Sequence, residues 1–401
     1  MTTPAPDWKA AAAAASEARD DARRLAGGVS AFAAALYAEL ADGNANNVFY
    51  SPASLALSLA MAREGARGET AAEIGAALIL PDLPADRLRT AFAALSSAPP
   101  ADSGVELRVA NALFAQIGEH WAPEFFKVLA ERFDAPLRQI NFQADAERAA
   151  HGINHWVRQQ TKGRVDAIVD PGTLPPTTKL VLANAVYLRG LWSTPFTKKL
   201  TRDAPFQRRD GSRVPVPMMH QRGGYRMYQM AGVQILDLPY DSSPISMTVI
   251  LPRNDAALPA TGAEIATTLI LLMAHLDRQP SREIDVFLPR FRLDMRTRFA
   301  DALAKLGVVR AFDAQTADFS GMNGKPDDLF IGTVAHRAMI EVEEAGTVAA
   351  AATGLRVERL SAPVDQAEIP VFRADHPFLF VIRDSRTNNI LFLGRVMDPR
   401  G

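Results

Sequence analysis

The sequence contains no cysteine, which excludes disulfide bonds and metal sites built on thiolates and leaves no bridge from which to infer a redox compartment. It also lacks a charge surplus, because 44 Lys and Arg residues face 45 Asp and Glu residues. Binding to nucleic-acid phosphates requires a basic excess, so we expect no nucleic-acid partner. The longest apolar runs are too short to cross a bilayer, and we therefore expect no membrane association.

Motifs of the common enzyme classes are missing as well. The chain has no Gly-x-Ser-x-Gly turn, and Gly324-Lys325 is followed by Pro326, unlike a phosphate-binding loop. His151 and His155 have the spacing of a zinc-protease pair, but Gly152 stands where that motif requires glutamate. We therefore expect one surface histidine and one partly buried histidine, with no metal site, no cofactor and no enzymatic activity.

Helical and strand-like segments alternate along the chain without a long flexible linker. Ser51-Pro52 predicts a helix start, with serine as the cap and proline in the first turn, and Thr70-Ala-Ala-Glu73 predicts a capping box for the next helix. Residues 179–188 are almost entirely apolar, which is typical of a strand covered on both faces. This mixed order predicts one α+β domain.

Residues 341–377 do not fit an ordinary element. Glu344-Ala-Gly-Thr347 leads into four alanines, Ala349–Ala352, and then Thr353. An alanine-rich helix is one interpretation, but four alanines between β-branched residues and glycine form a poor helix. With a period of two, Thr347–Val357 has one face of small or apolar residues and an opposite face that ends in charge. The pattern predicts a strand able to enter an existing sheet, since bulky or charged inward side chains would hinder insertion.

This segment resembles the reactive-loop hinge of the serpins, and the resemblance extends from about Ser30 to Pro399. Each matching motif is weak alone, but their order and spacing together are specific. The motifs include Phe49-Tyr-Ser-Pro-Ala-Ser54, Asn111-Ala-Leu-Phe114, Ile153-Asn-His-Trp-Val157, Leu182-Ala-Asn-Ala-Val-Tyr187, Leu238-Pro-Tyr240, Leu288-Pro-Arg-Phe291, His336-Arg-Ala338, Asp375-His-Pro-Phe-Leu-Phe380 and Ile390-Leu-Phe-Leu-Gly-Arg395. The resemblance implies the serpin fold, with three β-sheets, eight or nine helices and an exposed reactive-centre loop at about residues 344–369. It also implies a single serpin domain over residues 30–401, preceded by an N-terminal extension, 1–29, that is helical or disordered.

The chain is thus similar to inhibitory, bacterial-like serpins, and the resemblance implies a suicide-substrate mechanism. A serine protease would cleave the loop and become acylated, and the freed hinge would enter the central sheet before the acyl bond is hydrolysed. The native state would be metastable, and the implied partner is the target protease, held in a covalent acyl complex. We expect a monomer.

The position of the cleaved bond follows from the family's loop length, in which cleavage usually follows the seventeenth residue counted from the hinge glutamate. Counting from Glu344 gives Leu360-Ser361, and leucine suits chymotrypsin-like or subtilisin-like proteases with an apolar pocket. A loop that is one residue shorter gives Arg359-Leu360, which suits a trypsin-like protease. Arg356 is a third candidate, and we favour Leu360.

The resemblance also implies two groups of supporting residues. Ser51, Ser54, Asn184 and His336 match positions that hydrogen-bond beneath the opening sheet. For His336 the alternative is a buried core histidine with its hydrogen bonds satisfied, and the two interpretations largely coincide. Trp192 matches the tryptophan near the point where the hinge first inserts. The hinge itself is expected to comprise Glu344, Gly346, Thr347, Ala349, Ala350, Ala351, Ala352 and Thr353.

Two alternatives remain at this stage. The first is a non-inhibitory serpin that acts as a binding module; such members tend to carry proline, charge or bulk in the hinge, and residues 346–353 of this hinge carry none. The second concerns location, because the resemblance implies the extracellular space. The alanine run Ala10–Ala15 is too short, and too soon followed by charged residues, for a secretory signal, so the cytoplasm is the alternative.

Overall fold

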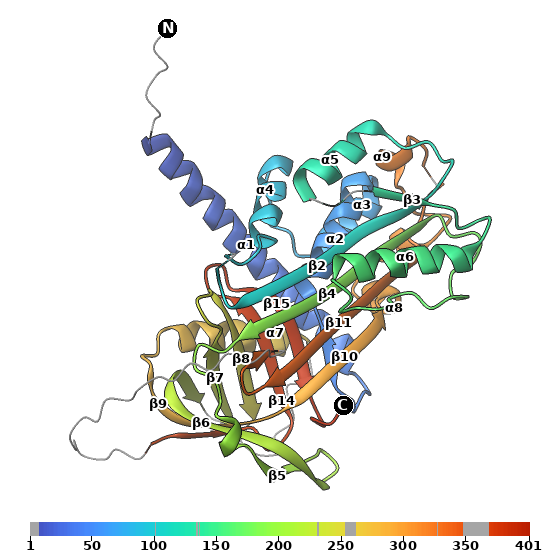
Figure 1. Cartoon of the computed structure of the whole chain (residues 1–401). Helices are drawn as coiled ribbons and strands as arrows, with labels where there is room; N and C mark the ends of the chain where they lie inside the picture. Colours follow the sequence, from blue (N-terminus) through green and yellow to red (C-terminus); the bar gives the residue numbers. More distant parts are fainter. Residues whose placement is uncertain are drawn as a thin grey trace.

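Two β-sheets with helices packed around them make up the computed structural model (Figure 1). The described residues are 8–100, 102–133, 135, 137–230, 232–252, 262–326, 328–347 and 369–401.

The six-stranded sheet contains the long central strands. Its strands, in spatial order, are β10 (Phe291–Arg298), β11 (Thr333–Glu343), β12 (Gly346–Thr347), β4 (Leu180–Leu191), β2 (Val105–Gln116) and β3 (Leu137–Ile140). Strand β4 confirms the prediction for residues 179–188. Leu180 and Leu182 pack in the cluster that contains α2 (Pro52–Gly65), whereas Val181 and Ala183 pack with α6 (Ala146–Gln160) on the other face.

The nine-stranded sheet curves around one end of the molecule. Its strands are β1 (Val48–Tyr50), β15 (Asn389–Val396), β14 (Phe378–Asp384), β8 (Ile245–Pro252), β7 (Val233–Pro239), β6 (Arg213–Met230), β9 (Arg282–Pro289) and β13 (Val371–Arg373), with β5 (Arg202–Gln207) also paired to β6. The 18-residue β6 divides this sheet, because residues 213–225 pair with β5 and β9, and residues 226–230 pair with β7. If the nine-stranded sheet is divided at β6, whose two parts pair with different strands, the three expected sheets are obtained.

The described residues form nine α-helices, in agreement with the expected eight or nine. Besides α2 and α6 these are α1 (Trp8–Ala41), α3 (Gly68–Ala77), α4 (Ala85–Leu95), α5 (Pro123–Phe133), α7 (Gly262–Asp277), α8 (Ala300–Lys305) and α9 (Ser320–Asn323), with short 3₁₀ turns at η1 (Lys198–Leu200) and η2 (Arg310–Phe312). Helix α1 continues through residue 29 without interruption, and the domain boundary there stays a prediction.

The start of α2 is as predicted, since the Ser51 hydroxyl accepts a hydrogen bond from the Ser54 amide at 3.2 Å and Pro52 occupies the first turn. The predicted capping box of α3 is wrong, because α3 begins at Gly68. The Thr70 hydroxyl instead accepts from the Asp318 amide, and the Glu73 carboxylate accepts from the amides at the start of η2.

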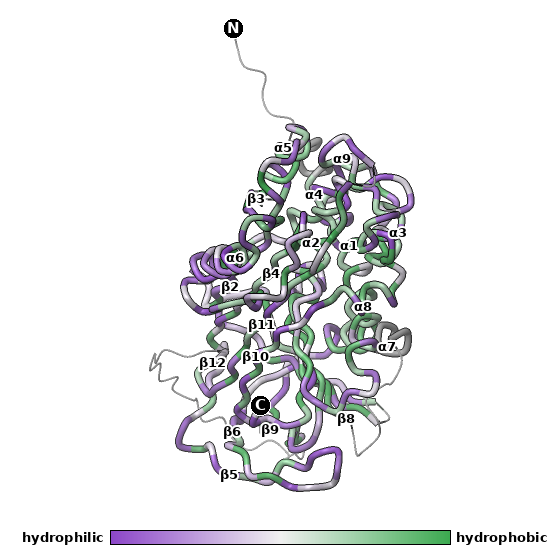
Figure 2. Tube along the Cα trace, turned by 90° about the vertical axis from the view of Figure 1, so that its right-hand side faces the viewer, coloured by the Kyte–Doolittle hydropathy of each residue, from purple (hydrophilic) through white to green (hydrophobic). Residues whose placement is uncertain are grey.

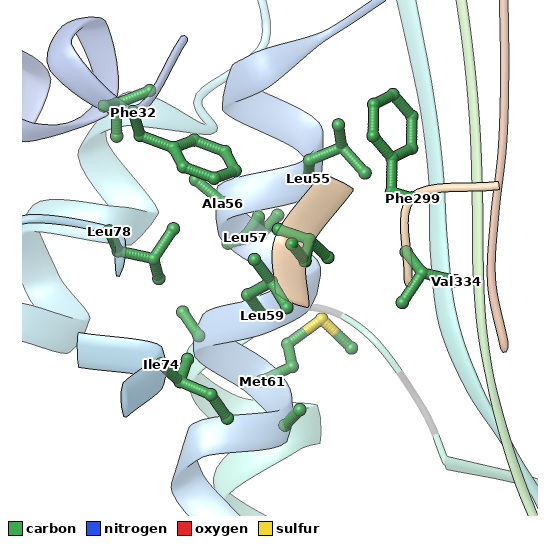
Figure 3. Packing of buried hydrophobic residues seen from close by; sticks show 14 of the residues in the cluster. Phe32, Leu55, Ala56, Leu57, Leu59, Met61, Ile74, Leu78, Phe299 and Val334 are labelled. Carbon is green, nitrogen blue, oxygen red and sulfur yellow. The ribbon is translucent and has the colours of Figure 1, made fainter. Parts of the chain in front are cut away.

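Helix α2 is buried along most of its length in the main core, which explains why leucine and alanine are its commonest residues. Its side chains Leu55 and Leu59 lie among Phe32 of α1, Ile74 of α3 and Phe299 (Figure 3). By contrast, α6 presents a hydrophilic outer surface (Figure 2). Among the described residues, no helix combines the length and the apolarity needed to cross a bilayer.

Candidate functional site

The candidate site is the place where the hinge meets the six-stranded sheet. Strands β4 and β11 are parallel neighbours from the pair Val181 and Thr333 to the pair Tyr187 and Met339, and we call this parallel interface the seam. Beyond the seam the two strands are separated by β12, which is antiparallel to both. Strand β12 lies at the end of the sheet nearer to β5 and β6 (Figure 2). Gly346 and Thr347 therefore form a two-residue strand between β4 and β11.

Thr347, the second residue of β12, is fully buried. Its hydroxyl lies 2.7 Å from the Tyr240 hydroxyl. The Tyr240 ring stacks on Trp192 with a centroid distance of 4.8 Å and an interplanar angle of 7°. Trp192 in turn donates from its indole nitrogen to the Glu343 carbonyl and from its amide to the Ala345 carbonyl, both at 3.0 Å. The structure thus places Trp192 against the hinge, where the resemblance implied that it would lie.

Tyr240 is a residue of this site that the sequence did not single out. Its phenol is buried, and burial raises its pKa, so the group stays neutral and can donate to Thr347. The Leu238-Pro-Tyr240 motif was visible in the sequence, but nothing in it indicated a contact with a segment more than 100 positions away.

Gly346 is required by the narrow space between the strands. Its φ is +153°, and a Cβ atom there would lie 1.9 Å from the Gly190 carbonyl oxygen. A Cβ atom on Gly190 would in turn lie 2.6 Å from the Tyr240 ring. Any side chain at either position would push β12 out of the sheet.

Glu344 anchors the hinge just before β12. One carboxylate oxygen accepts from the Thr201 hydroxyl at 2.6 Å and from the Arg290 guanidinium at 2.9 Å, and the side chain is 1% exposed. Burial alone would raise the pKa of Glu344, but the hydrogen bonds from Arg290 and Thr201 hold it below the ordinary value of 4.5. The backbone carbonyl of Glu344 also accepts from the Phe196 amide at 2.8 Å.

A second, polar cluster lies within the seam. His336 and Asn184 are directly paired across β11 and β4, and His336 Nδ1 is hydrogen-bonded to the Asn184 side-chain oxygen. His336 Nε2 accepts from the Ser51 amide at 3.2 Å. The imidazole is therefore neutral with its proton on Nδ1, and burial lowers the pKa of His336 to about 3.

The cluster extends to α2 and β2. The Asn184 amide group donates to the Asn111 oxygen at 2.6 Å and to the Ser54 hydroxyl, and Ser54 donates to the same Asn111 oxygen at 2.8 Å. The structure thus brings together all four residues that the resemblance placed beneath the opening sheet. Asn111 completes the network and was missed as a site residue, because its motif gave no indication of its partners.

The remaining sequence predictions have different outcomes. The candidate reactive bonds at Arg359, Leu360 and Ser361 and the hinge residues Ala349, Ala350, Ala351, Ala352 and Thr353 lie outside the described residues, so these assignments stay predictions. His151 and His155 are both exposed on α6, so the expectation of a partly buried histidine is wrong. The described residues contain no group of three or more His, Asp or Glu side chains that could hold a metal ion.

Comparison with known proteins agrees with this geometry. The family profile described as Serpin (serine protease inhibitor) matches residues 28–399. An uncharacterized serpin-like protein of Thermococcus kodakarensis is 38% identical over 374 residues, which cover 93% of this chain and 85% of that protein. The leukocyte elastase inhibitor of Homo sapiens is 35% identical, over 92% of this chain and 97% of its own length. Serpin48 of the insect Tenebrio molitor superposes with a TM-score of 0.82 at 28% identity, over 94% and 98% of the two chains.

Proposed function

The chain belongs to the serpin family, and from this premise we propose that it is an irreversible inhibitor of a serine-type endopeptidase rather than an enzyme. Relatives of matching length, such as the leukocyte elastase inhibitors, are named for protease inhibition. The observation that carries the proposal is β12, because Gly346 and Thr347 lie between β4 and β11 and the predicted loop continues from them.

The proposed reaction begins as ordinary proteolysis. The protease serine oxygen attacks the carbonyl carbon of Leu360, the bond to the Ser361 nitrogen breaks, and that nitrogen leaves as an amine with the proton. The protease remains attached to Leu360 as an ester. The freed hinge then continues from Thr347 into the seam and carries the protease with it before water can cleave the ester.

The strand pairing supplies a driving force for this step. The seam is a parallel interface, whereas β12 is antiparallel to both of its neighbours. Each further inserted residue would therefore replace part of one parallel pairing with two antiparallel ones, which increases the number of backbone hydrogen bonds and favours the more stable arrangement.

Small side chains line the interface that must open. Ala183 and Ala185 of β4 and Ala335 and Ala338 of β11 lie within the seam, and all four are buried. Alanine side chains offer little steric hindrance to a new strand, and the hinge sequence is equally rich in alanine. A side-chain contact across the seam is the His336–Asn184 hydrogen bond, which an inserted strand has to break together with the backbone hydrogen bonds between β4 and β11.

The test uses chymotrypsin or subtilisin, whose apolar pockets fit the predicted Leu360. We expect a covalent complex that survives boiling in detergent. Mass spectrometry of the released C-terminal fragment should show a first residue of Ser361; a fragment that begins at Leu360 would favour the trypsin-like target instead. Simple cleavage with full recovery of protease activity would contradict the inhibitory function.

A further inference from the structure

Positive charge is concentrated beside the reactive loop. Residues 198–226, 282–290 and 369–376, which we call the basic rim, contain eleven Lys and Arg and five Asp and Glu. They carry a net charge of +6, so the rest of the chain carries −7. Nine of the eleven basic residues are exposed. Arg208 and Arg290 pair with Asp398 and Glu344 from outside the rim, and counting those two acids still leaves a surplus of four.

The basic rim lies between the two ends of the loop. At one end, Glu344 is bonded to Thr201 beside η1 and β5. At the other end, the chain returns as β13, which pairs with β9. The predicted bond Leu360-Ser361 is eight residues before Ile369, a span of at most about 29 Å of extended chain. A protease bound at that bond would therefore overhang the rim, because even a small domain has a diameter of about 30 Å.

The outer face of β6, β9 and β13 holds its charges in a fixed arrangement. His220, Phe287 and Arg373 form one row across the three strands. The imidazole stacks on the phenyl ring with a centroid distance of 4.3 Å, and the Arg373 guanidinium carbon lies 3.7 Å from the centroid of the same ring. Stacking on the aromatic face orients the guanidinium while leaving its N–H groups available for a carboxylate.

The neighbouring row is Arg222, Asp285 and Val371. Asp285 bonds Arg222 at 2.7 Å and His220 at 3.0 Å, and this double contact lowers the pKa of Asp285. The single acid in these two rows is thus engaged within the face, and Arg373 has no acidic partner among the described residues. Val371 is 48% exposed beside it. Arginine is one of the residue types that are enriched in interface hot spots.

From this arrangement we infer that the basic rim docks an acidic surface of the target protease next to its active-site cleft, which accelerates the encounter. The inference rests on the proposed function and adds that the target protease carries an acidic surface beside its active site. A positive rim of this size would attract an acidic protease and repel a basic one. The effect would be on the association rate and would weaken with salt, since the screening length falls from about 30 Å at 0.01 M to about 8 Å at 0.15 M.

The experiment measures docking separately from trapping. Anhydrochymotrypsin, whose active-site serine is converted to dehydroalanine, can dock but cannot acylate. It is compared with its succinylated form, in which lysine ammonium groups have become carboxylates. We expect the succinylated form to associate faster with the unmodified inhibitor at 0.01 M salt, and this advantage to disappear at 0.15 M or above.

A matched pair of triple variants tests the location. Lys199→Glu, Arg213→Glu and Arg373→Glu reverse three exposed charges of the rim, whereas Lys127→Glu, Arg148→Glu and Arg298→Glu make the same net change on α5, α6 and β10. The rim variant should associate with succinylated anhydrochymotrypsin about tenfold more slowly at low salt, and the control variant should be little changed. Equal slowing of both variants, or no effect of succinylation, would overturn the inference. Active chymotrypsin run in parallel reports the covalent complex, so its absence would count against the inhibitory function and leave the docking result interpretable.

Discussion

Thr347 is the residue of β12 nearest to the seam, and its buried hydroxyl contacts Tyr240. Arginine at this position would bring a guanidinium group into a buried site that offers it a phenol and no carboxylate. Such a charge costs at least about 3 kcal/mol. The uncleaved variant can avoid this cost by releasing β12 from the sheet, whereas insertion has to bury the residue, so insertion would slow about a hundredfold. We therefore expect Thr347→Arg to be cleaved as a substrate without trapping the protease.

The measurement is the ratio of covalent complex to cleaved chain on a denaturing gel. Thr347→Val is the matched control, because it removes only the hydroxyl contact with Tyr240 and keeps the shape of the side chain. It should still trap protease. Undiminished trapping by Thr347→Arg would show that insertion does not proceed through this position.

His336 makes the closed seam sensitive to pH. Its pKa is lowered from 6.5 to about 3 by burial. Between these two pH values the unfolded chain therefore binds a proton on His336 that the native chain does not bind. The resulting stability contribution is complete above pH 6.5 and is lost as the pH falls toward 3. Between pH 7.5 and pH 5 the loss should be about 2 kcal/mol.

The midpoint of urea unfolding, measured at pH 7.5, 6 and 5, tests this expectation. His336→Gln can still accept from the Ser51 amide and donate to Asn184, but it does not titrate in this range, so its midpoint should fall much less. His155→Gln, an exposed change on α6, should behave like the unmodified chain. A pH dependence that persists in His336→Gln would assign the effect to another group.

At the scale of elements, residues 161–178, which follow α6, cover the seam. Val165, Ile168 and Val169 pack in the cluster that includes Ala183 and Ala335 on the outer face of β4 and β11. Asn154 of α6 holds this segment in place, because its oxygen accepts from the Ile168 and Val169 amides and its nitrogen donates to the Val169 carbonyl at 2.7 Å.

Replacing Asn154 with alanine would remove all three hydrogen bonds and leave two buried amides without partners. We expect a loss of about 2–4 kcal/mol in the free energy of unfolding, read from urea unfolding at pH 7.5. Gln159→Ala on the exposed part of the same helix should change it by less than about 0.5 kcal/mol. A similar effect for both changes would show that the segment is held by its apolar contacts instead.

Elements with strong local signals were predictable from the sequence. The apolar run 179–188 and the Ser51-Pro52 cap identified β4 and the start of α2, because hydrophobic periodicity and capping act over a few residues. The start of α3 was not predictable, since Thr70 and Glu73 bond segments that lie more than 200 positions away. The pairing of β12 was not predictable for the same reason, because it depends on the distant strands β4 and β11.

The site residues also divide into those that the sequence could indicate and those that depend on distant contacts. The hinge residues stood out by composition, and the family resemblance supplied Trp192, Asn184 and His336. Tyr240 and Asn111 became visible only in three dimensions, through contacts with Thr347 and Asn184. The basic rim could not be recognised from the net charge of −1, since its surplus is assembled from three separated parts of the chain.

At the scale of the whole molecule, β12, the hydrogen bonds that hold Glu344 and the basic rim lie at the same end of the fold (Figures 1 and 2). A protease drawn to the rim would thus meet the loop at the place from which insertion starts. Complete insertion would then move the tethered protease along the length of β4 and β11, toward the opposite end of the sheet. The free energy for this movement has to come from the new pairings of the loop strand.

Cleavage of the loop should therefore stabilise the molecule. Insertion of residues after Thr347 would add antiparallel hydrogen bonds to both β4 and β11 and bury more apolar side chains. We therefore expect the free energy of unfolding to increase by many kcal/mol. The rise in Tm should be well above the 2–4 °C that a single kcal/mol produces in a domain of 150–250 residues. Differential scanning calorimetry of the chain before and after limited proteolysis measures this gain, and mass spectrometry confirms that the cut lies within residues 348–368. The cleaved Thr347→Arg variant is the control, because a strand that cannot enter the seam gives no new pairings. An unchanged Tm after cleavage of the unmodified chain would mean that β12 is the full extent of insertion and would remove the driving force from the proposed mechanism.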